Sequence, residues 1–225
     1  MKTTIAAPHT QSPDQIAEAL EVDLQQGLTG AQARRRFAEA GPNELEEKGR
    51  PGFLRLLAEQ FNNFLIIVLI AAATVSFLVG EPVDAIAILV IVVLNAVMGV
   101  VQESKAERAL EALKQMSAPE AHVLRDGEMQ TIPVTRVVPG DVVVLEAGSS
   151  VPADLRLAES VNLRIDEAAL TGESVPVKKR AKAVLEEKAS LGDRENCAFM
   201  ATPVSYGRGR GVVTATGMHT EMGKI

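Results

Sequence analysis

The stretch Asp166-Glu167-Ala168-Ala169-Leu170-Thr171-Gly172-Glu173-Ser174 decides how the rest of the chain is interpreted. Gly172 has no Cβ, so it allows a sharp turn and the close approach of another surface. Glu173 then stands at the tip of the turn between the hydroxyls of Thr171 and Ser174. A carboxylate presented this way can accept a proton from a water molecule or position the water for attack. An ordinary polar loop is the alternative, and the neighbouring segments decide between the two.

Residues 119–225 have the pattern of a compact all-β unit, because short apolar runs alternate with closely spaced turns. Asp126-Gly127 predicts a hairpin, and Pro139-Gly140-Asp141 opens a strand at 142–146. The glycine-rich stretch 207–211 lacks the Lys-Ser/Thr pair and the following helix of a P-loop. A bulged strand is therefore favoured over a phosphate cradle. The charged segment 178–194 is expected to be an exposed excursion, with a docking or protease-sensitive loop as an open alternative.

Two uncharged runs, 61–80 and 85–101, precede the β unit. A helix over the first run is about 30 Å long, which matches the hydrocarbon thickness of a bilayer. The alternative is a pair of core helices in a globular protein, which would leave little polar surface to solvate the fold. Asn95 lies within the second run and is expected to bond to a neighbouring helix. Helical spacing continues beyond this run and predicts a stalk that ends before Pro119.

The distribution of basic residues orients the predicted transmembrane hairpin. No Lys or Arg lies between Arg55 and Lys105. Both outer ends are therefore expected in the cytoplasm, with the tip at 81–84 on the opposite side. The flanking basic residues are Lys48, Arg50 and Arg55 before the pair, and Lys105, Arg108 and Lys114 after it.

Two short helices are predicted before the hairpin, and each begins with a capping box. Ser12 with Gln15 starts the first, and Thr29 with Gln32 starts the second, which ends near Ala40 before Gly41. Residues 1–11 show no periodicity and are expected to be disordered or loosely held. The basic run 34–36 is interpreted as a solvated helix face near a membrane surface rather than a nucleic-acid site.

Composition excludes several other classes of protein. The chain has 225 residues, 47% of them hydrophobic, and a net charge of −6, which argues against nucleic acid as a partner. Cys197 is the single cysteine, so no internal disulfide can form, and a buried structural thiol is expected. The three histidines are far apart, so no metal site is expected. No signal peptide is recognisable after Lys2.

The order of these parts resembles the N-terminal portion of a P-type cation-transporting ATPase, closest to the calcium-pump-like branch. The resemblance covers about residues 15–225. It is carried by 27–29 (Gly-Leu-Thr), 41–45 (Gly-Pro-Asn-Glu-Leu), 59–61 (Glu-Gln-Phe), Gln102-Glu103 with Ala106-Glu107, 139–141 (Pro-Gly-Asp), 151–154 (Val-Pro-Ala-Asp), 166–174, and Thr216-Gly217 with 220–225.

The resemblance implies an α+β membrane protein with three parts. Residues 1–57 would form cytoplasmic helices packing near the actuator. Residues 58–118 would form a two-helix transmembrane hairpin with its stalk, and residues 119–225 a small, distorted jelly-roll-like actuator domain. The protein would be integral to the plasma membrane with both termini cytoplasmic. Its partners would be membrane lipid, the other pump domains and the transported cation, with no nucleic acid.

The same resemblance implies how the chain would act. Glu173 would position and activate the water that hydrolyses an aspartyl phosphate made on another domain. Gly172 would allow the close approach, and Thr171 and Ser174 would shape the loop. In-line attack on a phosphoryl group needs a placed water more than a strong base. ATP and Mg²⁺ would serve the complete pump, while this chain would bind no cofactor or metal.

Three departures from the family pattern qualify this interpretation. The later Asp-Lys-Thr-Gly motif is absent, so the chain alone should neither hydrolyse ATP nor transport an ion, and is expected to be part of a pump. Gly148-Ser149 replaces the usual Gly-Asp, which loses a turn carboxylate and is expected to loosen that loop. Asn62-Asn63 replaces acidic residues, which weakens the assignment to calcium. The alternatives are a sodium/potassium or proton pump, and a non-catalytic membrane regulator with an actuator fold.

Overall fold

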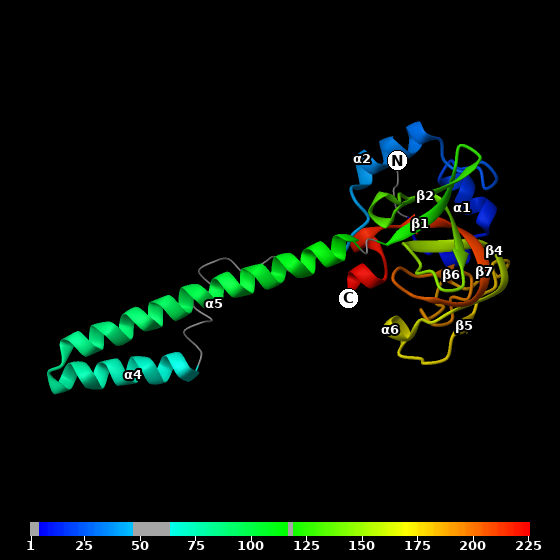
Figure 1. The fold of residues 1–225 in the computed structure, drawn as a ribbon. Coiled ribbons are helices and arrows are strands. Elements are labelled where there is room, and N and C mark those ends of the chain that lie inside the picture. The colour runs from blue at the N-terminus through cyan, green and yellow to red at the C-terminus, as the bar shows by residue number, and fades with distance from the viewer. Residues whose placement is uncertain (1–4, 47–63, 117–118) are drawn as a thin grey trace. The chain divides into compact units, whose positions relative to one another are not determined.

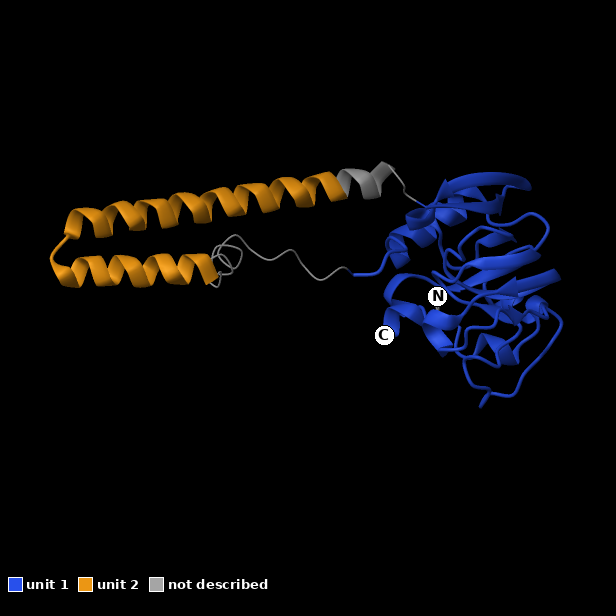
Figure 2. Cartoon of the chain, turned by 60° about the horizontal axis from the view of Figure 1, so that its bottom comes forward, with its two compact units in different colours: residues 1–46, 118–225 blue, residues 47–117 orange. Residues whose placement is uncertain are grey.

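The computed structural model describes residues 5–46, 64–116 and 119–225, with 111–116 described by their backbone. The chain divides into two compact units (Figure 2). Residues 1–46 and 118–225 form one unit, which holds the strands and the N-terminal helices. Residues 47–117 form the other unit, which holds two long helices.

The strand-rich unit is built on a seven-stranded antiparallel sheet (Figure 1). The strand order is β2-β1-β3-β7-β4-β5, and β6 also pairs with β4. The predicted hairpin is confirmed, because β1 and β2 pair across the turn at Asp126-Gly127. The strands are β1 (Glu120–Arg125), β2 (Glu128–Pro133), β3 (Val142–Glu146), β4 (Asp154–Ile165), β5 (Val177–Lys178), β6 (Cys197–Ala198) and β7 (Val204–Ala215).

The long strands β4 and β7 form the spine of the sheet, and their pairing is interrupted by several register shifts. The glycine-rich stretch lies inside β7, so the favoured interpretation of a bulged strand is confirmed. A Cβ on Gly211 would lie 2.9 Å from the carbonyl oxygen of Arg156, and one on Gly209 would lie 2.9 Å from that of Glu159. These glycines are needed because the backbone of β4 passes so closely.

The core of this unit lies beneath β4 and β7. Leu155, Leu157, Leu163 and Ile165 of β4 are at most 1% exposed, and they pack with Val213 of β7. Side chains that alternate along a strand point to opposite faces, but parts of β4 are covered on both faces, so its burial is nearly continuous over 154–157. The strand therefore presents its end at Ile165, where the chain enters the Thr-Gly-Glu-Ser stretch, from a fixed position.

Short helices precede the sheet, namely η1 (Pro8–Thr10), α1 (Pro13–Ala19) and α2 (Gly30–Ala40). Both predicted capping boxes are confirmed: Ser12 accepts from the Gln15 amide, and Thr29 accepts from the Gln32 amide. The interpretation of run 34–36 as a solvated face is wrong for Arg36, which is 3% exposed. Its guanidinium donates to the carbonyl oxygens of Pro139 and Leu20, which the local sequence does not reveal.

The expectation of a loosely held N-terminus is wrong for residues 5–11, whereas residues 1–4 lie outside the described residues. His9 is 2% exposed, and its carbonyl oxygen accepts from the Leu185 amide at 3.0 Å and from Asn196 Nδ2 at 2.8 Å. Arg156 Nε donates to the carbonyl oxygen of Gln11 at 2.9 Å. These partners are far away in sequence, so hydrophobic periodicity carries no signal of them.

The helical unit contains α4 (Phe64–Val79) and α5 (Pro82–Met116), which pack side by side (Figure 1). Small residues of α5, including Ala85 and Ala96, are buried against α4, where Ala73 is 4% exposed. Gly80 ends α4 with a positive φ, and Pro82 begins α5, a combination typical of adjacent helix ends. The helical spacing predicted beyond the second uncharged run is confirmed, because α5 runs without a break to Met116.

One described helix is long and apolar enough to cross a membrane, over Pro82–Leu110. The shorter α4 is about 24 Å long at 1.5 Å per residue, and residues 61–63 of the predicted first span lie outside the described residues. Most apolar side chains of both helices are exposed, including Phe64 at 81% and Leu94 at 61%. Core helices of a globular domain would instead bury these side chains.

Candidate functional site

The Thr-Gly-Glu-Ser turn follows a single helical turn, α6 (Ala168–Thr171). The carbonyl oxygen of Glu167 accepts from the amides of Leu170 and Thr171, each at 2.9 Å. Gly172 caps this turn in the left-handed region with φ 76°, and its amide donates to Ala168. A glycine at this position avoids the strain that a Cβ would cause, and it turns the chain sharply outward.

Glu173 is exposed, and so are Gly172 and Ser174 on either side of it. The Glu173 amide donates to Thr171 Oγ1 at 3.3 Å, and the same hydroxyl donates to the carbonyl oxygen of Glu167 at 3.1 Å. The Thr171 hydroxyl therefore joins the exposed acid to the base of the turn. This arrangement leaves the Glu173 carboxylate open to a water molecule or to a docking surface.

A fully buried ion pair lies at the base of the turn. Lys179 Nζ is 2.5 Å from Glu167 Oε1, and both side chains are 0% exposed. Burial raises the pKa of Glu167 and lowers the pKa of Lys179, while the attraction between the two charges opposes both shifts. The prediction of an exposed excursion over 178–194 is therefore wrong at Lys179, because a buried acid from a distant part of the loop compensates its charge.

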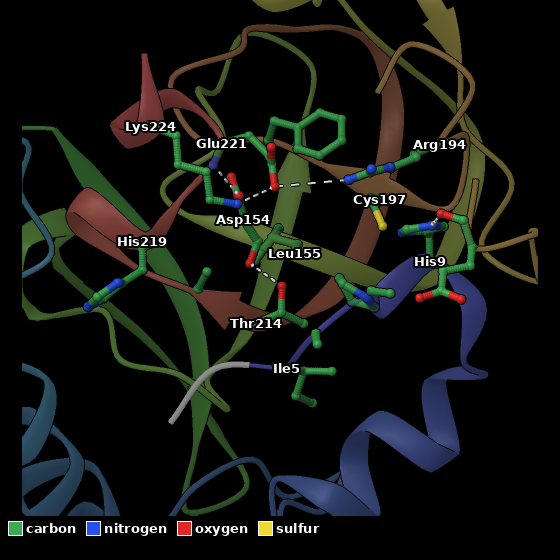
Figure 3. Close-up of a pocket in the computed structure, with 16 residues that line it drawn as sticks. Ile5, His9, Asp154, Leu155, Arg194, Cys197, Thr214, His219, Glu221 and Lys224 are labelled. Atoms are coloured by element: carbon green, nitrogen blue, oxygen red, sulfur yellow. Dashed lines mark hydrogen bonds and ion pairs between the residues drawn. The ribbon is translucent and has the colours of Figure 1, made fainter. Parts of the chain in front are cut away.

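Asp154 lines a cavity of about 440 Å³ near the beginning of β4 (Figure 3). Its two carboxylate oxygens accept from the amides of Met200 at 2.9 Å and Glu221 at 2.7 Å. Burial raises its pKa to about 6, although both hydrogen bonds favour the charged form. Glu221 in turn lies 2.7 Å from Lys224 and 3.9 Å from Arg194, so the cavity mixes charges of both signs.

Arg156 is a second buried charge that sequence reasoning missed. Its side chain is 0% exposed, every partner that it has among the described residues is a backbone carbonyl oxygen, and burial lowers its pKa. It thereby ties β4 to the N-terminal segment and to the loop before β6. The accepting residues are Gln11, Leu157, Ala181, Ala183 and Asn196.

The expected state of Cys197 is confirmed, since this free thiol is buried and burial raises its pKa to about 12. Among the described residues, no three His, Cys, Asp or Glu side chains gather in a possible metal site. The expected loosening at Gly148-Ser149 is not what the geometry shows. Ser149 Oγ donates to the carbonyl oxygen of Glu146 at 2.6 Å and accepts from its amide at 3.2 Å, so a hydroxyl holds the turn.

The structure thus brings Thr171, Gly172, Glu173 and Ser174 together in one exposed turn and places Glu167 and Lys179 beneath it. Glu167 and Asp154 both lie inside stretches that carry the family resemblance, which was the available signal for them. Lys179 and Arg156 gave no signal, because their partners come from distant segments.

Comparison with known protein families gives two matches along the chain. Residues 115–225 match the P-type ATPase actuator domain, and residues 8–76 match the cation transporter/ATPase N-terminus. The chain belongs to the P-type ATPases. The resemblance drawn from the sequence is therefore confirmed, as is the expected combination of helices with an antiparallel sheet.

Three similar relatives of this P-type ATPase chain show the range of transported ions in their names. Calcium-transporting ATPase 1 of Bacillus cereus is 51% identical over 221 residues, which are 96% of this chain and 25% of that protein. The calcium-transporting ATPase of Bacillus subtilis is 44% identical, over 96% and 24%. Sodium/potassium exporting P-type ATPase 2 of Saccharomyces cerevisiae is 39% identical, over 97% and 20%. The chain therefore spans about a quarter or less of these relatives.

Proposed function

We propose that this chain is the N-terminal part of an ATP-driven P-type pump that transports calcium. In this proposal Glu173 positions and activates the water that hydrolyses an aspartyl phosphate on another domain of the pump. The observation that carries the proposal is the exposed Glu173 carboxylate on a glycine-capped turn, in a chain that matches the actuator domain. Thr171, Gly172 and Ser174 shape this turn, with the Thr171 hydroxyl holding the Glu173 amide.

The proposed arrangement has residues 1–57 as cytoplasmic helices, residues 58–118 as a transmembrane hairpin with a stalk, and residues 119–225 as a distorted jelly-roll-like actuator. The exposed apolar surface of α4 and α5 supports lipid as the surroundings of the hairpin. Asn95 is exposed on α5 and would bond to another membrane helix of the pump. The basic residues that flank the hairpin support cytoplasmic termini, and the proposed location of the hairpin is the plasma membrane.

The transported ion is proposed from the relatives. The Bacillus proteins are named for calcium, which supports calcium for this chain. The Saccharomyces relative, named for sodium and potassium, favours a second candidate, a sodium or potassium pump. The complete pump would use ATP and Mg²⁺, and we assign no residue of this chain to either. The other pump domains and the cation would be the partners.

The proposal is tested with a complete pump in which this chain replaces the matching quarter of the Bacillus cereus relative. Glu173→Gln should leave phosphorylation by ATP intact and slow hydrolysis of the phosphoenzyme by about a hundredfold or more, because only the second step uses the carboxylate. Ser205→Ala, on an exposed hydroxyl of β7, is the control. Unchanged phosphoenzyme hydrolysis in Glu173→Gln would refute the role.

A further inference from the structure

The buried pair of Glu167 and Lys179 encloses the segment 168–178, which contains the whole Thr-Gly-Glu-Ser turn. Glu167 immediately precedes α6, and Lys179 immediately follows β5. Their side chains meet at 2.5 Å with neither exposed to solvent. The segment between them is thus closed at its base by a charge–charge contact in the protein interior.

The C-terminal end of the closed segment is paired with β4, and its N-terminal end follows β4 directly after Asp166 and Glu167. Lys178 pairs with Arg164 and Val177 pairs with Ile165, and the Lys179 amide donates to the carbonyl oxygen of Leu163 at 2.9 Å. The backbone therefore sets where the segment begins and ends. The angle at which α6 and its glycine cap stand relative to β4 determines where Glu173 points, and the buried pair is a side-chain contact that joins the two ends of the segment.

A continuous set of contacts leads from the buried pair to Glu173. The Glu167 side chain holds Lys179, and the carbonyl oxygen of the same residue accepts from the Thr171 hydroxyl at 3.1 Å. That hydroxyl accepts from the Glu173 amide at 3.3 Å. A Cβ built on Gly172 would meet no atom within 4 Å, so the space around this residue is open, whereas a Cβ built on Gly192 would lie 3.5 Å from Thr171 Cγ2. The hydrogen bonds from Glu173 to Thr171 and from Thr171 to Glu167 therefore join the tip to its base.

The buried pair of Glu167 and Lys179 is not expected to contribute much to the stability of the fold. Glu167 Oε2 has no hydrogen-bond donor among the described residues, while the Lys179 ammonium donates to the carbonyl oxygen of Arg194 at 3.4 Å and lies 5.5 Å from the centre of the Phe199 ring. Burying two charges with such incomplete compensation contributes little stability, and an apolar pair of similar volume is often equally stable. A directional contact at this place is better explained by orientation than by stability.

We propose that Glu167 and Lys179 are positioning residues that hold the Thr-Gly-Glu-Ser turn at the angle required for phosphoenzyme hydrolysis. This inference rests on the function proposed above for Glu173. The pair touches neither the phosphoryl group nor the water, and acts only through the turn that it closes. Loss of the pair leaves Glu173 chemically intact and displaced.

The first test measures the turn itself in the whole 225-residue chain in detergent micelles. Glu167→Gln combined with Lys179→Met removes both charges and keeps the approximate volumes, so it avoids the unpaired buried charge that either single variant would leave. Amide hydrogen exchange in 170–175 should become about tenfold faster or more, with exchange in β4 and β7 unchanged. Arg180→Gln, which breaks the adjacent exposed ion pair with Glu195, is the matched control and should leave both regions unchanged.

The second test uses the complete chimeric pump described above. The double variant should form phosphoenzyme from ATP at the normal rate and hydrolyse it about tenfold to a hundredfold more slowly, as expected for a displaced catalytic group. A purely structural role predicts instead that the double variant, being well folded, hydrolyses normally.

The outcomes separate this inference from the proposed function. Unchanged exchange in 170–175, or normal hydrolysis by the double variant while Glu173→Gln is slow, overturns the positioning role alone. Normal hydrolysis by Glu173→Gln overturns the proposed function, and the positioning role falls with it, even if exchange shows that the pair orders the turn.

Discussion

The two units of this chain treat apolar side chains in opposite ways. In the strand-rich unit Leu157 and Val213 are 0% exposed, whereas in the helical unit Leu78 is 78% exposed and Phe77 is 66% exposed. Both units are rich in Val, Leu and Ile. One unit is organised by exclusion of water around its own core, whereas the other leaves most of its apolar side chains on its surface, which is what the proposed lipid surroundings require.

The largest expected effect is on the stability of the packed core of the strand-rich unit. Leu157→Ala should lower the free energy of unfolding of the strand-rich unit by about 2–5 kcal/mol, because it leaves a cavity in a packed core. Leu89→Ala on α5, which is 47% exposed, should change stability far less. Denaturant unfolding of the whole chain in detergent, followed by circular dichroism, measures both. Equal effects would remove the distinction between the units.

The next largest effect concerns the exposed apolar surface of α5 in the helical unit. Leu94→Arg places a charge on the exposed apolar face of α5 and should cost membrane insertion about 3 kcal/mol. Val161→Arg, on a side chain of β4 that is 52% exposed, is the matched control and should be tolerated. The fraction of chain that remains with membranes after carbonate extraction measures the difference. Full retention of Leu94→Arg would argue against a lipid-facing helix.

A third effect is the pH dependence of stability, which is expected in the strand-rich unit because the carboxyl group of Asp154 is buried in it. Burial raises the pKa of folded Asp154 from its ordinary value of 3.8 to about 6, so its contribution to stability is present below pH 4 and is lost as the pH rises through 6. Relative to Asp154→Asn, the chain should lose about 2–3 kcal/mol of stability between pH 4 and pH 7. Unfolding of both proteins across this range is the measurement, and parallel pH profiles would contradict the assignment.

The smallest effect compares a threonine that caps α2 in the strand-rich unit with a threonine inside α4 in the helical unit. Thr29→Ala removes the side-chain cap of α2 and should cost about 1 kcal/mol, because the Gln32 amide loses its acceptor. Thr74→Ala in α4 removes a hydroxyl that donates to Ile70 within the same helix, and should cost much less. Amide exchange at the first turn of α2 reports the loss, and unchanged protection there would show that tertiary contacts alone hold this helix.

Much of the fold was predictable because its signals are local. Capping boxes at Ser12 and Thr29, the turn at Asp126-Gly127 and the uncharged runs each depend on residues a few positions apart. The prediction failed where a segment is held by distant partners. Residues 5–11 were expected to be loosely held, and Arg36 and Lys179 to be exposed. His9 and the two basic side chains are instead buried, and carbonyl oxygens or a carboxylate outside their own local segment contact them.

The candidate site also contains some features that local sequence predicts and others that depend on distant partners. The sequence by itself determined that Glu173 follows a glycine in a turn and that the chain resembles a P-type ATPase, since residue type and spacing are sufficient for both. Only the tertiary structure decided that Glu167 meets Lys179 beneath the turn and that Asp154 reaches the Glu221 amide. The physical reason is that a buried charge is tolerated only where folding brings a compensating group to it, and no local pattern records where that group comes from.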